Sequence, residues 1–373
     1  MFGALAEKDF RLLWGGALCA FLGFFTSVVV QAVVAFELTG ENTPVGWVVF
    51  ARGLAMLLLG PVGGAMADRL SKRAVLLVCQ AVATLVFAGL AILMLTDNMT
   101  VLYLVLGGFL VGMTFSFLGP TRQAYAVELV PEDRWGNAVA LNQVALNASR
   151  VGGPALAGFI LAQPVGATGA FTVMAILYLM AVLSHARLPP YVHATPPSKR
   201  SVLTDIQEGL RYVRERPHLQ SLVLYFVLVI MFGFPYVVVL PGLVEHTLHR
   251  SADAVSVLFG TSALGGLAAS LGVAPLADSK HAIAMHLGAG LAFAASLFGL
   301  SFVTTMLEAN VAVIAVGLST GVMTTLNGAV LLRASEPRYL GRVMSLALLA
   351  FAGFGVIGLP IGILADGMGE SAC

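Results

Sequence analysis

Long apolar runs separated by short polar segments dominate the chain. Each run has about 20 or more mostly apolar residues, the length that an α-helix needs to cross the hydrocarbon core of a bilayer. Eleven runs of this kind occur, at 11–37, 44–66, 74–95, 101–125, 137–162, 166–185, 219–244, 254–276, 281–303, 309–332 and 342–366. The pattern predicts an all-α membrane protein with eleven spans.

The basic residues predict the orientation of these spans. With the N-terminus placed in the cytoplasm, only Arg250 falls outside, and Arg52, Arg122 and Arg150 lie within spans. The other 16 of the 20 Lys and Arg residues fall at cytoplasmic ends: Lys8, Arg11, Arg69, Lys72, Arg73, Arg134, Arg187, Lys199, Arg200, Arg211, Arg214, Arg216, Lys280, Arg333, Arg338 and Arg342. This distribution follows the positive-inside rule and supports the span count.

Composition agrees with a lipid environment. Of the 373 residues, 58% are hydrophobic and 10% are charged, whereas a soluble domain carries about 25% charged residues. The 41 glycines suit close packing of membrane helices. The three cysteines have no metal-ligand spacing. No Walker or H-E-x-x-H motif occurs, which disfavours an ATP-driven pump and a hydrolase of the H-E-x-x-H type.

One polar segment divides the chain into two parts. We expect an N-terminal six-helix half at 1–185, a cytoplasmic linker at 186–218 and a C-terminal half at 219–373. Within the linker, the residues from Val202 to Arg216 place Ile206, Leu210 and Val213 on an apolar face and charged residues elsewhere. This pattern predicts an amphipathic helix at the membrane interface. A simple linker between the halves and a partner-docking helix are the two interpretations, and the linker is favoured.

The two halves contain an internal repeat. The segment 130–138 follows the fourth span and resembles 335–343, which follows the tenth. Pro154 and Pro360 are 206 positions apart, and Asp68 and Asp278 are 210 apart. An even number of spans separates the copies, so both have the same orientation. Parallel repeats of this kind are known in secondary transporters.

A charged motif between the second and third spans is the most specific signal. It has the form G-x-x-x-D-R-x-x-K-R and consists of Gly64, Asp68, Arg69, Lys72 and Arg73. The motif resembles the corresponding loop of major facilitator superfamily transporters. That resemblance implies two six-helix halves that rock about a central site, with this loop as a gate. The alternative is a loop whose charges only fix the topology.

Further segments extend the resemblance over nearly the whole chain. The segments 9–14, 38–40 and 131–158 are similar to the branch that contains the enterobactin exporter and bacterial drug-efflux proteins. The second copy of the gate motif keeps Asp278 and Lys280 but lacks the arginine pair. We therefore expect asymmetric gate contacts.

The fifth span carries a polar face. Gln143, Asn147, Arg150 and Pro154 are spaced four, three and four residues apart and share one face of a helix, with Asn142 beside it. A cation within a span is costly and should meet protein or water. The two interpretations are a polar cavity wall and hydrogen bonding between helices.

The same span contains a helix-bend motif at Gly153, Pro154 and Gly158. Glycine and proline together weaken a helix and permit a bend. The motif partly matches one that marks antiporters in the superfamily, although Ala157 replaces an expected glycine.

Further candidate site residues lie outside the motifs described above. Gln31, Arg52 and Asn327 complete the expected cavity residues. Arg122 is either a proton-transfer residue, as the resemblance implies, or a side chain that snorkels to the cytoplasmic face. No acid lies near the middle of a span, so the coupling candidates are Glu37, Arg122 and Glu128 at or near span ends.

The repeat predicts a twelfth span after Asp366. We expect either a truncated twelve-span protein or an eleven-span variant. The overall expectation is a multi-pass protein of the bacterial inner membrane with a cytoplasmic N-terminus. It is expected to be a monomeric secondary transporter and not an enzyme, to use no cofactor and not to bind nucleic acid.

The expected activity is proton-coupled export, by antiport, of small hydrophobic or amphipathic molecules such as drugs or siderophores. The alternatives are an uptake carrier, a lipid translocator and a truncated membrane protein that does not transport.

Overall fold

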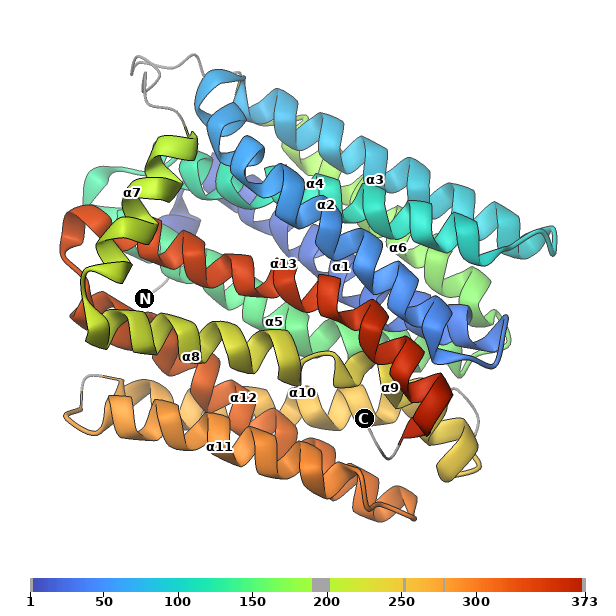
Figure 1. The fold of residues 1–373 in the computed structure, drawn as a ribbon. Coiled ribbons are helices and arrows are strands. Elements are labelled where there is room, and N and C mark those ends of the chain that lie inside the picture. The colour runs from blue at the N-terminus through green and yellow to red at the C-terminus, as the bar shows by residue number, and fades with distance from the viewer. Residues whose placement is uncertain (1–2, 190–201, 251–252, 278, 371–373) are drawn as a thin grey trace. The chain divides into compact units, whose positions relative to one another are not determined.

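The computed structural model describes residues 3–189, 202–250, 253–277 and 279–370 (Figure 1). Side chains at 61, 63–69, 140, 143, 147, 202–206, 253, 337–338, 340–342, 344–345, 347–349 and 351 are outside that description. The described backbone is helical, without strands, which confirms the predicted fold class. Ten segments of it are long and apolar enough to cross a membrane, and the shorter apolar stretch Ala352–Met368 coincides with the eleventh predicted run.

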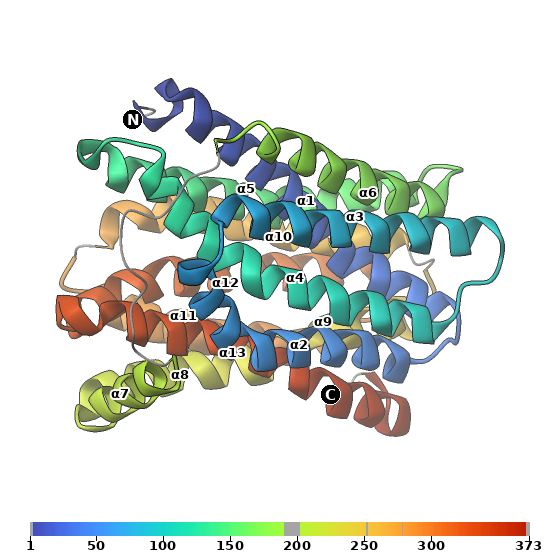
Figure 2. The ribbon, with the colours of Figure 1, turned by 90° about the horizontal axis from the view of Figure 1, so that it is seen from above.

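The first compact unit comprises Met1–Val34 and Leu54–Val202. In it α3 packs against α4 and α6, as Figure 2 shows for α3 and α4. Tyr125 and Leu76 are among the apolar side chains buried at one end of these helices. The helices that contribute to this unit are α1 (Lys8–Glu37), α2 (Asn42–Arg69), α3 (Lys72–Leu95), α4 (Val101–Glu128), α5 (Trp135–Leu161) and α6 (Gly166–His185), with short 3-10 turns at Gly3–Ala6 and Glu132–Arg134.

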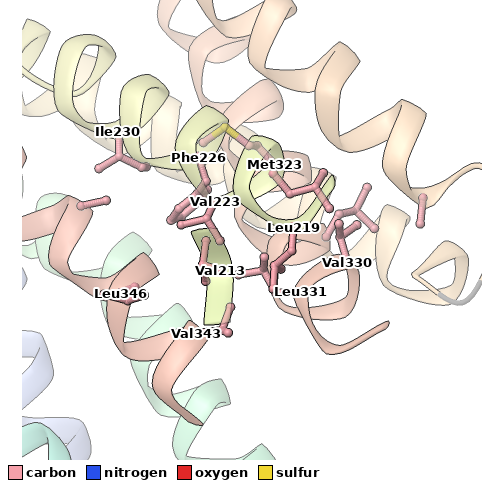
Figure 3. Close-up of a cluster of buried hydrophobic side chains, with 14 of the residues drawn as sticks. Val213, Leu219, Val223, Phe226, Ile230, Met323, Val330, Leu331, Val343 and Leu346 are labelled. Atoms are coloured by element: carbon pink, nitrogen blue, oxygen red, sulfur yellow. The ribbon is translucent and has the colours of Figure 1, made fainter. Parts of the chain in front are cut away.

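The second unit comprises Ala35–Gly53 and Leu203–Cys373. In it α12 packs against α10 and α11, and α8 packs against α13. Figure 3 shows its buried cluster, where Phe226 and Ile230 of α8 meet Met323 of α12 and Leu346 of α13. Its helices are α7 (Val202–Arg214), α8 (Pro217–Gly233), α9 (Tyr236–Gly242), α10 (Asp253–Val273), α11 (Ala282–Leu300), α12 (Met306–Ala334) and α13 (Pro337–Met368), with a π-helical turn η3 (Leu243–Thr247) and a 3-10 turn η4 (Ala274–Leu276).

The division between the units falls inside α1 and α2. The last residues of α1 and the first twelve of α2 pack with the second unit, and the remainder of each helix packs with the first. The boundaries at 185 and 219, which rest on the polar segment between the two sets of apolar runs, stay a prediction.

Two features differ from the expected spans. The single predicted run 219–244 is interrupted, because α8 ends at Gly233 and α9 begins after Pro235. Proline lacks the N–H that continues a helix. In the linker the predicted amphipathic helix is α7, but its predicted apolar residue Leu210 is exposed, while Tyr212 and Val213 are buried.

Candidate functional site

The basic residues of the charged motif join three helices of the first unit. Ser71 is the N-cap of α3, and its hydroxyl accepts a hydrogen bond from the Ala74 N–H at 3.4 Å. Lys72 begins α3, and its Nζ lies 2.7 Å from Oε1 of Glu128, the last residue of α4. The Lys72 side chain is 6% exposed and that of Glu128 is 29% exposed. Lys72, predicted as part of the gate motif, and Glu128, predicted as a coupling candidate, therefore form one ion pair.

The neighbouring arginine contacts the end of another helix. Arg73 donates a hydrogen bond to the carbonyl of Ala186, the C-cap residue of α6. A cation at a helix C-terminus is stabilised by the helix dipole. The side chains of Asp68 and Arg69 lie outside the described residues, and so does residue 278 of the second copy. In that copy Lys280 is exposed.

A buried polar contact missed at the level of sequence lies close to this motif. The Nδ1 atom of His185 is 3.0 Å from the Gln80 side-chain amide, and its Nε2 is 3.1 Å from the Leu13 carbonyl. The carbonyl requires an Nε2–H donor, so in the neutral imidazole Nδ1 accepts. Oε1 of Gln80 faces Nδ1 and cannot donate, so the neutral tautomer pairs with Gln80 only when the amide is turned to bring its Nε2 to that side. The contact joins α1, α3 and α6 around a histidine that is completely buried.

Arg122 is buried within the first unit. Its side chain, on α4, is 3% exposed, and its guanidinium carbon lies 4.0 Å from the centroid of the Phe21 ring on α1. Its Nε and Nη1 atoms have no hydrogen-bond partner among the described residues. The two interpretations of Arg122, proton transfer and snorkelling to the cytoplasmic face, both stay predictions.

The polar face of α5 is described in part. The guanidinium of Arg150 lies 5.9 Å from the Phe25 ring centroid on α1. Asn142 is buried, and neither of its amide atoms has a partner in the described part of the chain. The side chains of Gln143 and Asn147 lie outside the described residues.

The helix-bend motif lies against α1. A Cβ atom on Gly153 would collide with Phe25 and with the backbone of Thr26. The Thr26 hydroxyl donates to the Gly153 carbonyl at 3.2 Å. Pro154 lies inside α5, so glycine at 153 allows α1 to approach at the point where proline removes a backbone donor.

The remaining candidates lie in different parts of the fold. Gln31 is completely buried on α1 beside Gly107 of α4. Arg52 is buried on α2 and Asn327 is buried on α12, whereas Glu37, the last residue of α1, is exposed. Arg52 and Asn327 both fall in the second unit.

Sequence reasoning also missed a polar cluster in the second unit. Asp366, near the end of α13, binds the first residues of α2. The two segments are more than 320 positions apart, and no local pattern relates them.

Comparison with known proteins gives the context for these residues. The family described as transmembrane secretion effector matches residues 1–369. The staphyloferrin A transporter of Staphylococcus aureus (strain NCTC 8325 / PS 47) is 27% identical over 275 residues, which are 72% of this chain and 68% of that protein. An uncharacterized MFS-type transporter of Bacillus subtilis (strain 168), YfiS, is 25% identical over 223 residues, 57% of this chain and 50% of that protein. The match therefore spans half the length of the Bacillus relative.

A solved structure shares the fold. A bacterial homologue of the human lysosomal transporter Spinster, in an inward-facing and occupied conformation, gives a TM-score of 0.74 at 14% identity, over 96% of this chain and 83% of that one. At this identity the likeness shows the fold alone. The helical membrane fold, the charged motif and the match over nearly every residue agree: the chain belongs to the transmembrane secretion effector family of major facilitator superfamily transporters.

Proposed function

We propose that the chain is a proton-coupled antiporter that exports small amphipathic molecules with an acidic group, siderophores among them, across the bacterial cell membrane. The family description and the relative named for staphyloferrin A transport support transport of this class. The distribution of Lys and Arg supports a cytoplasmic N-terminus.

The buried Arg122 is the observation that carries the substrate class. Its guanidinium lies over the Phe21 ring, with two nitrogen atoms that have no partner among the described residues. A cation within a span costs at least about 2.5–3.5 kcal/mol on insertion scales, and such residues mark substrate or ion pathways. An anionic group of a substrate would supply the missing hydrogen-bond acceptors.

Aromatic rings around this arginine supply an apolar surface. Phe24 and Phe115 stack with their ring centroids 4.1 Å apart, and Phe21 lies 6.4 Å from Phe115. Arg150 adds a second guanidinium over Phe25. Rings next to guanidinium groups match a molecule with an apolar body and an acidic group.

Transport in proteoliposomes tests the proposal. Protein is reconstituted in vesicles loaded with an iron-free siderophore that carries carboxylate groups, or with an acidic fluorescent drug. Efflux is followed with and without a pH gradient. We expect flux that depends on the gradient. Arg122→Gln should lower flux about tenfold or more, because a buried charged partner contributes about 1.5–3 kcal/mol. Arg122→Lys should retain part of it.

Arg187→Gln is the matched control, because Arg187 is an exposed arginine just beyond α6 in the same unit. We expect it to transport at the rate of the parent. Equal flux in Arg122→Gln and the control would overturn the anionic substrate class. Net uptake of substrate would overturn the proposed direction of transport. Absence of flux for every acidic and neutral compound tested would overturn the proposal as a whole.

The charged motif supplies a second test of the same function. Asp68→Asn is expected to slow transport without changing the amount of protein in the membrane, because the family resemblance makes Asp68 a gate residue. Transport at the parental rate would leave the motif with a purely topological role.

A further inference from the structure

The carboxylate of Asp366 caps the N-terminus of α2 from a distant part of the chain. Its Oδ1 accepts hydrogen bonds from the backbone N–H of Asn42 at 2.7 Å and from the Asn42 side-chain Nδ2 at 3.1 Å. Its Oδ2 accepts from the backbone N–H of Thr43 at 2.7 Å and from the Thr43 hydroxyl. Both carboxylate oxygens are thus occupied by the first two residues of one helix. We refer to these contacts among Asp366, Asn42 and Thr43 as the Asp366 cap.

The Asp366 cap replaces a local N-cap. The first N–H groups of a helix have no partner within the helix, and a side chain just before the helix usually accepts from them. Here the acceptor comes from α13, and its negative charge lies at the positive end of the α2 dipole. Hydrogen bonds to an ionised acceptor are roughly twice as strong as neutral ones. Asp366 is open to solvent, whereas Asn42 is completely buried.

A second acid continues the Asp366 cap to another helix. Oε1 of Glu370 accepts from Nδ2 of Asn42 at 3.0 Å and lies 2.7 Å from Nδ1 of His246. His246 belongs to the π-helical turn that follows α9. The ring of His246 also lies against Phe36 near the end of α1, with centroids 5.5 Å apart. Segments of α1, α2, α13 and the π-helical turn therefore meet at the end where α2 begins.

Glycines bring the same helices together below the Asp366 cap. A Cβ on Gly53 of α2 would collide with Gly355 of α13, and a Cβ on Gly355 would collide with Gly53. A Cβ on Gly46 would lie 3.0 Å from the Gly358 carbonyl, and one on Gly362 would lie 2.8 Å from the Asn42 carbonyl. Small residues on both helices permit backbone contact. Gly53 is also the last residue of α2 that belongs to the second unit.

The contact between α2 and α13 joins the two repeats of the sequence. Residues 42–53 belong to the second span of the first repeat, and 352–368 to the fifth span of the second repeat. We propose that the Asp366 cap is a gate contact, which holds the first half of α2 against α13 in the state seen here and is released when transport opens that end. The proposal rests on the proposed function. By the proposed orientation, this gate faces the outside.

Labelling of a buried cysteine tests the gate without a substrate. Val49 of α2 is buried, and its Cγ1 would lie 3.0 Å from a Cβ on Gly358. Val49→Cys is placed in a chain whose cysteines at 19, 79 and 373 are replaced by alanine, and a maleimide labels the protein in nanodiscs. Slow labelling is expected, and Asp366→Asn should make it about fivefold to tenfold faster, because the amide cannot accept from all four donors.

Glu41→Gln is the matched control. Glu41 is an exposed acid one residue before α2, and its removal changes the net charge in the same way. We expect labelling at the parental rate in this control. Labelling of Asp366→Asn that does not exceed the control would overturn the gate contact.

A milder variant keeps the test valid when Asp366→Asn fails to fold. Thr43→Val keeps the backbone donor and the size of the side chain but loses the hydroxyl, and we expect about twofold to threefold faster labelling at an unchanged melting temperature. The proposal would be rejected if Thr43→Val left the labelling rate of the cysteine at 49 unchanged while Asp366→Asn either labelled at the rate of the control or failed to fold. Because labelling needs no substrate, a parent that shows no flux would overturn the proposed transport function, whereas the labelling rates would still test the contact between α2 and α13.

Discussion

The Lys72 ammonium and the Glu128 carboxylate form an ion pair of 2.7 Å between the start of α3 and the end of α4. Each charge alone opposes its own helix, because a cation at an N-terminus and an anion at a C-terminus both have unfavourable interactions with the helix dipole. Placing them together offsets both penalties and joins two helices of the first unit.

Glu128→Gln is expected to destabilise the protein, because the buried Lys72 would lose the carboxylate that lies 2.7 Å from its Nζ. Loss of one partner from a fully buried pair costs about 3–5 kcal/mol, and the partial exposure of Glu128 places the expected cost below that range. The melting temperature in detergent measures it. Lys72→Met combined with Glu128→Met should be closer to the parent than either single variant, and additive losses would show that the pair has no coupling energy.

Gly16→Ala is expected to destabilise α1 against α6. A Cβ on Gly16 would collide with Nε2 of His185, the atom that donates to the Leu13 carbonyl. Overpacking of this kind costs about 1–3 kcal/mol. The penalty should shrink when His185→Ala is already present, which a double-mutant cycle of melting temperatures measures. Gly15→Ala is the control, since nothing lies within 4 Å of a Cβ there. A Gly16→Ala penalty unaffected by the loss of the imidazole would disprove the collision.

Gly317→Ala is expected to separate α12 from α10. A Cβ on Gly317 would overlap the carbonyl of Ser262, and one on Gly321 would overlap that of Gly266. Backbone atoms cannot rotate away as a side chain does, so the cost should reach the upper part of the range of about 1–3 kcal/mol for overpacking.

Gly328→Ala lies on the same helix and meets nothing within 4 Å. It should be neutral or slightly stabilising, because alanine is favoured over glycine in a helix by about 1 kcal/mol. Size-exclusion chromatography after heating compares the two variants, and equal losses would contradict the packing.

Tyr212→Ala is expected to release α7 from the second unit. The Tyr212 ring stacks on Tyr339 with centroids 4.0 Å apart, and its hydroxyl accepts from the Glu336 N–H at 2.9 Å. Arg216 lies over the same ring and pairs with Glu336 at 2.7 Å. Removal of a large buried aromatic side chain costs about 3–5 kcal/mol, so amide hydrogen exchange in α7 should accelerate strongly.

Leu210→Ala provides the control, because Leu210 lies on the same helix but is exposed. Exchange in α7 should remain close to the parent in this variant. Similar protection in both variants would mean that Tyr212 does not hold the helix.

Much of the helical membrane fold could be predicted because lipid imposes a local rule. A spanning helix must be long and apolar over consecutive residues, and that property is visible in any window of sequence. The interruption of the seventh run was harder to predict. Gly233 and Pro235 are visible as helix-weakening residues, but the Phe293 ring that approaches Gly233 comes from a separate helix.

Candidate polar residues could be found but their partners could not. A charge within an apolar run is easy to recognise, so the position of Arg122 and Arg150 inside such runs makes both of them candidates. Their contacts with Phe21 and Phe25 depend on how α4 and α5 lie against α1. The pairing of Lys72 with Glu128 likewise joins two predicted candidates that no spacing rule connects.

By itself, the sequence determined the class of the protein, its apolar spans and the charged motif between the second and third of them. These follow from hydropathy and charge, which act over neighbouring residues. Only the tertiary structure decided that Asp366 caps α2, that Gly53 meets Gly355, and that His185 joins three helices. Hydrogen bonds and close backbone contacts act over a few ångströms, so they are specified by the packing of helices far apart in the chain rather than by any local pattern.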